Sequence, residues 1–328
     1  MDRQQARLRI EELRGEIQRH NRLYYQQSQP QISDQQYDLL DQELQALEKA
    51  WPEFASSDSP TGLVGSDRDG NFPSEPHSAP MLSLQNSYEL SEVEAFDQRV
   101  RRGLKLKKVV YTVEPKMDGV AVAARFRDGK FVMALTRGDG RQGDVITEKV
   151  ASFNEIPQEL PQQWRKVFPH SGVDEFEIRG EAYLTLSRFS QLNEERRQLE
   201  KPELANPRNA TAGTLKTLDT DEVRRRKLSI FFYQIFPLVE GRRAVESEAP
   251  VSDGPGLFNN PSLSMEFATH QDEMAALLAL GLPVNPFLKV ASSPEEIALH
   301  LEDLEKQRPD LDYQIDGAVI KVDSRQYQ

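Results

Sequence analysis

A lysine directly follows an apolar segment of the chain, in the sequence Val113-Glu114-Pro115-Lys116-Met117-Asp118-Gly119. The alternation over 109–114 predicts a β-strand, and Pro115 lacks an amide hydrogen, so we expect strand pairing to end there. Strand side chains alternate in direction, which puts Glu114 and Lys116 on one side. Only a neutral amine attacks, so desolvation or nearby cations would activate the lysine. The chemistry that suits it is nucleotidyl transfer, through a phosphoramidate to AMP or GMP. A Lys-x-Asp-Gly motif alone is a weak signal, so its context decides.

Further motifs accompany this lysine in a fixed order. They occupy residues 32–38, 80–86, 136–140, 177–181, 205–210 and 315–321. This order and spacing resemble the amino-terminal half of bacterial NAD-dependent DNA ligases, from about Leu13 to the last residue. The resemblance implies that Lys116 attacks the α-phosphorus of NAD, forms enzyme-AMP and releases nicotinamide mononucleotide (NMN), for nick sealing in DNA replication and repair. It also implies that Mg²⁺ assists.

The same resemblance implies an α+β fold. This is a nucleotidyltransferase (ATP-grasp-like ligase adenylation) fold of antiparallel sheets flanked by helices, preceded by a small helical domain. We expect a helical NMN-binding domain at residues 1–66, a linker at 67–80 and the adenylation domain at 81–328. The family's oligonucleotide-binding fold, zinc finger, helix-hairpin-helix region and terminal phosphopeptide-type domain have no counterpart here. Zinc is therefore expected only in a missing carboxy-terminal part. The chain is expected to be a fragment, truncated before the last nucleotidyltransferase motif and unable to seal nicks.

Residue periodicity predicts where the elements lie. Two helices are indicated by the apolar stripes Ile10, Leu13, Ile17, Tyr24 and Tyr37, Leu40, Leu44, Leu47, Trp51. Ser33 and Gln36 are spaced as a capping box for the second helix. Further helices are expected at 91–101, 187–199, 271–280 and 294–307, and strands at 120–126, 131–137, 176–183, 228–236 and 313–322. The Asp-Gly pair at 128–129 predicts a hairpin turn. A polar connection is expected at 56–80 and a surface insertion at 237–262.

Composition limits the partners. The chain has 328 residues, a net charge of −12 and a pI near 5.1. Binding to nucleic acid requires clustered cations, so we expect this chain to bind nicked double-stranded DNA only weakly. It has no Cys, which excludes disulfides and thiolate zinc sites and favours a reducing compartment. With neither a signal region nor an apolar run of membrane-spanning length, we expect a soluble cytoplasmic protein, without membrane partners and monomeric.

Two charged residues near the lysine have both a functional and a plainer interpretation. Asp118 could orient the lysine or a metal ion, or it could simply form a turn. Arg137 is predicted to emerge at the edge of an apolar strand face, where its guanidinium could bind phosphate or ribose oxygens. The alternative for Arg137 is a salt bridge to Glu181 or Asp139.

The resemblance assigns further residues to the adenosine pocket. It implies that Glu114 accepts a hydrogen bond from the adenine amino group and that the backbone of Ser83 and Leu84 lines the pocket. Glu181 would contact ribose or a metal ion, and Tyr233 would stack on adenine.

Two of these assignments have plainer alternatives. With Glu177 and Arg179, Glu181 could belong to a solvated charged face. Tyr233 alternates with Phe231 and Ile235, as a core residue would.

Three residues are expected to handle phosphate or metal. Lys321 shares a strand face with apolar residues, where an unpaired amine would be costly, so we expect a phosphate there. Asp316 is predicted on the other face and could hold a metal-bound water. Arg208 resembles a contact to phosphate or the DNA backbone, and its alternative is a helix-capping arginine.

The helical segment is expected to distinguish NAD from other nucleotides. A cationic nicotinamide ring needs an aromatic face, and its ribose needs carboxylate acceptors. These residue types are supplied by Tyr24, Tyr25, Asp34, Tyr37 and Asp38. Tyr24 and Tyr37 also lie on the core stripes, so burial explains part of their role.

Two other functions stay open. One is an RNA ligase or capping-type nucleotidyltransferase that uses ATP or GTP, which would not need the helical segment. The other is a catalytically idle paralogue that binds a nucleotide. Its support is a departure from the family at 143–149, which lacks the usual second acid and an Asn at Lys149. Lys216 likewise stands where Arg is frequent, which weakens bidentate phosphate binding.

Overall fold

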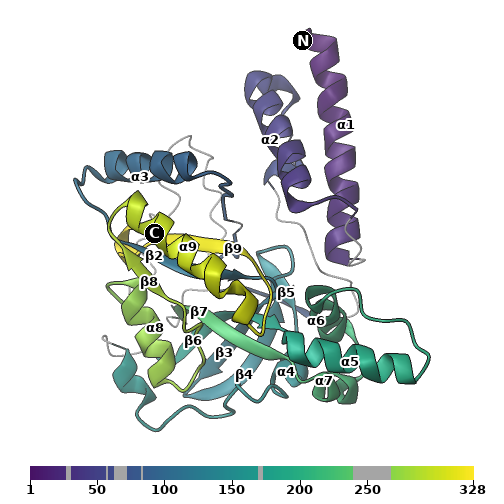
Figure 1. Cartoon of the computed structure of the whole chain (residues 1–328), viewed down its shortest axis with the longest axis vertical. Helices are drawn as coiled ribbons and strands as arrows, with labels where there is room; N and C mark the ends of the chain where they lie inside the picture. Colours follow the sequence, from purple (N-terminus) through teal and green to yellow (C-terminus); the bar gives the residue numbers. More distant parts are fainter. Residues whose placement is uncertain (27–30, 57, 63–71, 83, 169–172, 239–266) are drawn as a thin grey trace. The chain divides into compact units, whose positions relative to one another are not determined.

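A helical hairpin forms the first part of the chain (Figure 1). α1 (Arg3–Asn21) leads into a π-helical turn (Arg22–Gln26), and α2 (Asp34–Ala50) follows. The predicted capping box is confirmed, because Ser33 accepts from the Gln36 amide at 3.2 Å. The predicted stripes are confirmed except at Tyr24, which lies in the π-helical turn and outside this core. They form one small core of Ile10, Leu13, Ile17 and Leu44, with Tyr37, Leu40, Leu47 and Trp51 packed against it.

The computed structural model describes residues 1–26, 31–56, 58–62, 72–82, 84–168, 173–238 and 267–328. The chain divides into two units, Met1–Ser83 with Leu135–Val145, and Leu84–Ala134 with Ile146–Gln328. None of the described helices combines the length and apolar character that crossing a membrane requires.

The first unit also contains a two-stranded sheet. β1 (Ser74–Pro76) pairs antiparallel with β5 (Gln142–Asp144). β1 lies inside the stretch expected to be a linker, so that stretch is not wholly irregular. The turn before β5 needs glycine, because a Cβ at Gly138 (φ 59°) would lie 1.8 Å from the Gln142 carbonyl oxygen.

Two sheets organise the second unit. A three-stranded sheet has the order β8-β2-β9, with β2 (Tyr111–Met117) between β8 (Lys289–Ala291) and β9 (Ile315–Val322). A four-stranded sheet has the order β4-β3-β6-β7. Its strands are β3 (Val120–Arg127), β4 (Lys130–Thr136), β6 (Glu175–Tyr183) and β7 (Ser229–Leu238). The predicted hairpin turn is confirmed, since Asp128 (φ 50°) and Gly129 (φ 77°) both adopt the left-handed conformation.

Helices flank these sheets. They are α3 (Leu90–Leu104), α4 (Thr147–Val150), α5 (Leu186–Gln198), α6 (Pro207–Lys216), α7 (Thr220–Arg226), α8 (His270–Ala279) and α9 (Pro294–Gln307). Short 3₁₀ turns lie at Pro52–Phe54, Pro60–Gly62, Trp164–Val167, Arg308–Asp310 and Arg325–Tyr327. One core joins α3 and α9 to the β2 sheet through Val93, Tyr111 and Ile297. A larger core covers the four-stranded sheet. The fold is thus α+β with antiparallel strand pairing, as expected.

Strand β2 differs from the prediction at Pro115. Pairing does not end there, because Pro115 faces Ala318 of β9 and the strand continues to Met117. β8 pairs only with Tyr111–Val113, so among the described strands β2 has a single neighbour at the proline. A residue without an amide hydrogen is tolerated at such an edge. Of the insertion expected at 237–262, residues 237–238 end β7 and the rest lies outside the described residues.

Candidate active site

Lys116 and Asp316 meet on neighbouring strands. Lys116 faces Gly317 of β9, and the register shifts between Lys116 and Met117. This bulge leaves Asp316 out of the regular alternation that predicted it on the other face, and its carboxylate forms an ion pair with the lysine amine. The lysine side chain is 39% exposed, so a ligand can reach it. The pair can do proton chemistry, because a carboxylate beside an amine is placed to accept its proton.

Glu114 lies on the same face of β2 as Lys116 and is buried. Its Oε1 atom is 2.7 Å from His270 Nε2 and 3.0 Å from Lys321 Nζ. Burial alone would raise the pKa of Glu114, but the charge of Lys321 and the hydrogen bond from His270 outweigh it and lower the pKa to about 2. Glu114 is therefore an anion at neutral pH.

His270, at the start of α8, was not predicted as a site residue. Its Nδ1 atom lies 3.0 Å from Glu273, while Nε2 faces Glu114. Burial and the charge of Lys321 would lower the pKa of His270, but the hydrogen bonds to the two carboxylates outweigh them and raise it. The sequence signal was slight, because the capping pair Thr269 and Asp272 marks a helix start and no more.

Lys321 is not an isolated amine. The cost of burying it is met by the ion pair with Glu114, rather than by a phosphate alone. Its Nζ atom also lies 5.7 Å from the centre of the Tyr233 ring. The two residues assigned to adenine and phosphate thus lie beside each other.

Tyr233 does not take the core position that alternation suggested. The pairing of β6 with β7 shifts register beside Tyr233, with Phe232 facing Gly180 and Gln234 facing Arg179. Ile235 consequently returns to the core at 2% exposure, while Tyr233 stays half-buried. The simple core interpretation of Tyr233 is therefore wrong.

Glu177 and Arg179 do not form the solvated face that their sequence suggested. Glu177 is fully buried and binds Arg125 at 3.0 Å and Arg179 at 3.1 Å. The Arg179 guanidinium also lies 4.1 Å from the centre of the Phe236 ring. Glu181, further along the strand, is half-buried.

Gly119, in the lysine motif, allows β6 to approach. A Cβ there would lie 2.3 Å from the Ala182 carbonyl oxygen and 2.8 Å from Glu181 Cγ. The motif glycine therefore brings Glu181 close to the chain that carries Lys116.

Arg208, near the start of α6, binds Asp118 rather than capping the helix. Its Nη1 atom is 2.7 Å from the Asp118 carboxylate, and Asn206 supplies the helix cap. Both the turn interpretation of Asp118 and the capping interpretation of Arg208 are thus incomplete, because the two side chains pair.

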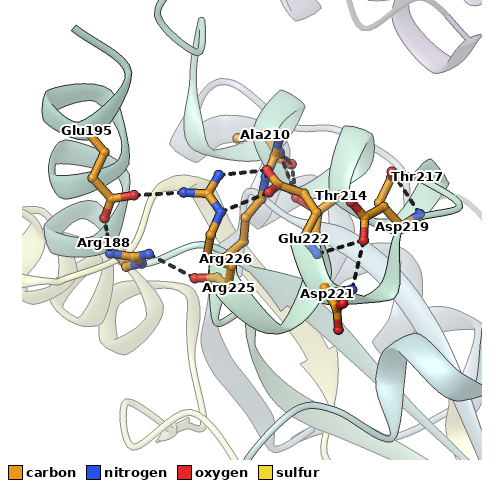
Figure 2. Close-up of polar contacts among 10 residues, drawn as sticks. All are labelled: Arg188, Glu195, Ala210, Thr214, Thr217, Asp219, Asp221, Glu222, Arg225 and Arg226. Atoms are coloured by element: carbon orange, nitrogen blue, oxygen red, sulfur yellow. Dashed lines mark hydrogen bonds and ion pairs between the residues drawn. The ribbon is translucent and has the colours of Figure 1, made fainter. Parts of the chain in front are cut away.

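A polar network holds α6 in place (Figure 2). Arg226 of α7 donates to the Ala210 carbonyl at 3.2 Å and to Thr214 Oγ1 at 2.9 Å. Glu222 accepts a hydrogen bond from Arg226 Nε at 2.7 Å, and this bond holds the Arg226 guanidinium in the orientation that reaches α6. The helix that carries Arg208 is thereby attached to α7.

The departure at Lys149 has a structural function. Its side chain is buried, and Nζ donates to the Leu215 carbonyl at 2.5 Å, in the last turn of α6. A cation at a helix C-terminus satisfies free carbonyls and complements the helix dipole. Lys149 therefore stabilises α6.

Several predicted site residues belong to the first unit. The Tyr37 hydroxyl donates to Asn21 at 2.8 Å, and Tyr24 and Asp38 are half-buried. The Arg137 carbonyl lies 3.0 Å from His77 Nε2, which anchors its backbone. The side chains of Tyr25 and Asp34 lie outside the described part of the chain.

The pocket segment 83–84 is only half described. Ser83 falls outside the described residues, whereas Leu84, at the start of the second unit, is 57% exposed.

No group of three or more His, Cys, Asp or Glu side chains is placed to hold a metal ion within the described ranges. Asp316 and Glu181, the two carboxylates expected to hold one, therefore belong to no preformed cage. Mg²⁺ commonly binds through one or two carboxylates together with substrate phosphates, and Asp316 beside Lys116 fits that use.

Comparisons with known proteins show which family the chain resembles. Residues 69–252 and 256–328 match the NAD-dependent DNA ligase adenylation domain, and residues 3–65 match the DNA ligase-like, N-terminal NAD⁺-binding domain. The chain is 40% identical over 327 residues to a DNA ligase of Geotalea daltonii and 39% identical to one of Geotalea uraniireducens. Each alignment covers 99% of this chain and 44% of the relative. A DNA ligase of Pseudothermotoga lettingae is 38% identical over 98% of this chain and 42% of its own length. The chain thus spans less than half the length of these relatives.

Proposed function

The chain belongs to the family of NAD-dependent DNA ligases, and from that premise we propose that Lys116 is the residue that becomes adenylated. Its amine attacks the α-phosphorus of NAD, an N–P bond forms, and the P–O bond to NMN breaks. Asp316, already bound to the amine, accepts the proton that the lysine must lose. The products are a phosphoramidate of AMP on Lys116 and free NMN.

The observation that carries this proposal is the placement of Glu114 and Lys116 on the same face of β2. A buried anion and a reachable amine lie two residues apart on one rigid strand. The anion suits the amino group of adenine, and the amine suits the phosphate of the same nucleotide. Tyr233 supplies an aromatic face beside Lys321 for stacking on the base.

Other residues supply charge and shape. Arg137 and Lys321 stabilise negative charge on the phosphate in the transition state. Asp118 and Glu181 orient the lysine and the ribose, and the backbone at Ser83 and Leu84 lines the adenosine pocket. Mg²⁺, when bound, would screen phosphate charge, with Asp316 or Glu181 as its protein ligand.

The helical hairpin holds the departing half of NAD. Tyr24, Tyr25 and Tyr37 offer aromatic faces to the nicotinamide ring, and Asp34 and Asp38 accept from its ribose. The family match of residues 3–65 favours NAD over ATP or GTP as the donor. The contact of Lys149 with α6 gives one part of the departure at 143–149 a structural function, which weakens the support for an idle paralogue.

Nick sealing belongs in this proposal to the whole ligase. AMP passes from Lys116 to a 5′-phosphate on nicked DNA, and the neighbouring 3′-hydroxyl displaces it. Arg208 contacts the DNA backbone or the phosphate at that stage.

Mass spectrometry of the intact chain tests the proposal. After incubation with NAD and Mg²⁺, we expect a mass increase equal to one adenylyl group (AMP less one water), located on Lys116 by peptide mapping and absent after incubation with ATP. Lys116→Ala is the negative control, and Lys107→Ala, an exposed lysine on another segment, is the matched positive control. An adduct formed equally well from ATP contradicts NAD use, and a chain that forms no adduct from either nucleotide contradicts the proposal.

A further inference from the structure

We propose that His270 is a positioning residue that immobilises one oxygen of Glu114, so that the other oxygen selects an amino purine over a 6-oxo purine. This inference rests on the proposed function, in which Glu114 faces the base of NAD. It adds a residue from α8, and a determinant of base specificity, to the site on β2.

The hydrogen bonds to Glu114 are unequally shared between its two oxygens. His270 Nε2 and Lys321 Nζ both contact Oε1, at 2.7 Å and 3.0 Å. Among the described residues, no hydrogen bond reaches Oε2. The side chain keeps 10% of its exposure, so this second oxygen remains available to a ligand. One oxygen is therefore fixed by the protein, and the other can accept a hydrogen bond from the base.

The ring of His270 must carry two protons to make its contacts. Both ring nitrogens face carboxylates, Nδ1 toward Glu273 at 3.0 Å and Nε2 toward Glu114. A neutral imidazole has one N–H, so a lone pair would face one of the carboxylates. The imidazolium donates to both. Lys321 Nζ, 3.2 Å from Nε2, then donates to Glu114 and not to the ring.

Residues from several elements surround the imidazolium and fix its hydrogen-bond partners. Glu273 is itself fixed, because its Oε1 accepts from the Ile235 amide at 2.7 Å and its Oε2 lies 3.5 Å from Arg325 Nε. The backbone amide of His270 donates to the Asp323 carbonyl at 2.7 Å. The Asp323 carboxylate accepts from Gln271 at 2.8 Å rather than from the ring. Among the described residues, the charged groups around His270 are thus Glu114, Lys321, Glu273, Arg325 and Asp323.

This arrangement dictates which base is accepted. An ionised carboxylate oxygen accepts hydrogen bonds and cannot donate one. Adenine presents an exocyclic amino group, which donates, whereas hypoxanthine presents a carbonyl at that position, which would face the anion. If Glu114 were free to rotate or to take up a proton, this discrimination would weaken. His270 prevents both, because it fixes Oε1 and adds positive charge beside it.

The test compares binding of NAD and of nicotinamide hypoxanthine dinucleotide by calorimetry. The proteins are the wild-type chain, His270→Gln, Glu273→Gln and the control His300→Gln, whose histidine binds the Val290 carbonyl away from this cluster. We expect wild type to prefer NAD by about 10–100-fold, the value of a hydrogen bond to a charged group. His270→Gln should reduce this ratio by about tenfold or more. Glu273→Gln keeps the side-chain shape and should shift the ratio in the same direction, whereas His300→Gln should keep it.

The ratio of the two affinities separates a positioning role of His270 from a merely structural one. A loss of stability alone would weaken the binding of both dinucleotides equally and leave the ratio unchanged. The wild-type ratio should also fall as the pH is raised and His270 loses its second proton, a readout that needs no substitution. A ratio that is unchanged in His270→Gln and flat with pH overturns this inference while leaving the proposed function intact. A wild-type chain that binds neither dinucleotide overturns the proposed function, and this inference with it.

Discussion

The guanidinium of Arg208 binds the carboxylate of Asp118 across 2.7 Å, although 90 positions separate the two residues in the chain. Asp118 follows the lysine strand directly, and Arg208 lies at the start of α6. The ion pair therefore ties the position of the lysine motif to a helix that is itself held by α7.

Removing the ion pair of Arg208 with Asp118 should lower the free energy of unfolding more than removing an exposed ion pair does. Arg208→Ala leaves Asp118, whose side chain is 26% exposed, without its partner, and the free energy of unfolding should fall by about 1–2 kcal/mol. Arg224→Ala removes an exposed pair with Asp221 and should change it by less than about 0.5 kcal/mol. Chemical denaturation of both variants measures the difference. Equal losses would show that the Arg208 pair contributes no more than a surface pair.

Lys116→Ala should separate chemistry from binding. We expect covalent AMP to disappear while the affinity for NAD stays within about tenfold, because the amine acts chiefly in the transition state. Intact mass measures the first quantity and calorimetry the second. Labelling that persists in the variant would assign the nucleophile to another residue.

Substitutions in the helical hairpin should affect the NMN half alone. Tyr24→Ala or Asp38→Ala should abolish adenylation by NAD but spare reversal of a preformed adenylate by pyrophosphate, where that reversal occurs. Gln42→Ala, an exposed change further along α2, serves as the control. If the two reactions weaken equally, these side chains only maintain the fold.

Lys149→Met should destabilise the chain through α6. The substitution keeps an unbranched apolar side chain but removes the donor to the Leu215 carbonyl, at a cost of about 1–3 kcal/mol. Thermal and chemical unfolding would measure it. An unchanged stability would mean that the Leu215 carbonyl finds another donor and that the lysine contributes nothing to α6.

The buried charge cluster should make stability depend on pH. The folded pKa of His270 is raised above the ordinary 6.5, so its contribution is fully present below 6.5 and is lost as the pH rises through the folded value. We therefore expect the free energy of unfolding to decline on the alkaline side of 6.5, and His270→Gln to reduce that decline. Denaturation between neutral and alkaline pH, with His300→Gln as control, measures it. An equal decline in both variants would locate the effect elsewhere.

The contribution of Glu114 to the free energy of unfolding should be lost at acid pH, whereas that of His270 is lost at alkaline pH. Its folded pKa of about 2 lies below the ordinary 4.5, so its contribution is present above 4.5 and is lost as the pH falls toward 2. The two groups together bound the pH range in which the cluster stabilises the fold.

Much of the framework could be predicted because its signals are local. The capping box of Ser33 and Gln36 and the turn at 128–129 depend on residues within a few positions of one another. The apolar stripe of α2 likewise repeats within its own helix. Such patterns survive in any tertiary context that buries the apolar face.

The rest depends on contacts that a linear pattern does not contain. His270 gains its role from Glu114, 156 positions away, and from Glu273 on its own helix. β-Bulges also make predictions from alternation fail, because one extra residue moves every later side chain of the strand to the opposite face. This is why Asp316 reaches the lysine and why Ile235 returns to the core.

Pro115 stands between the buried anion and the reactive amine, and the strand continues through it. Two residues of extended chain span about 6.4–6.8 Å, a length that pairing with β9 keeps constant. The proline ring fixes its own φ and restricts the residue before it, so the separation of Glu114 from Lys116 cannot stretch or fold without breaking the ladder. The strand therefore holds Glu114 and Lys116 at a fixed separation. Once the base is bound at Glu114, this separation determines which atom of the nucleotide lies next to the Lys116 amine. A base bound in another position would place a different atom beside the amine.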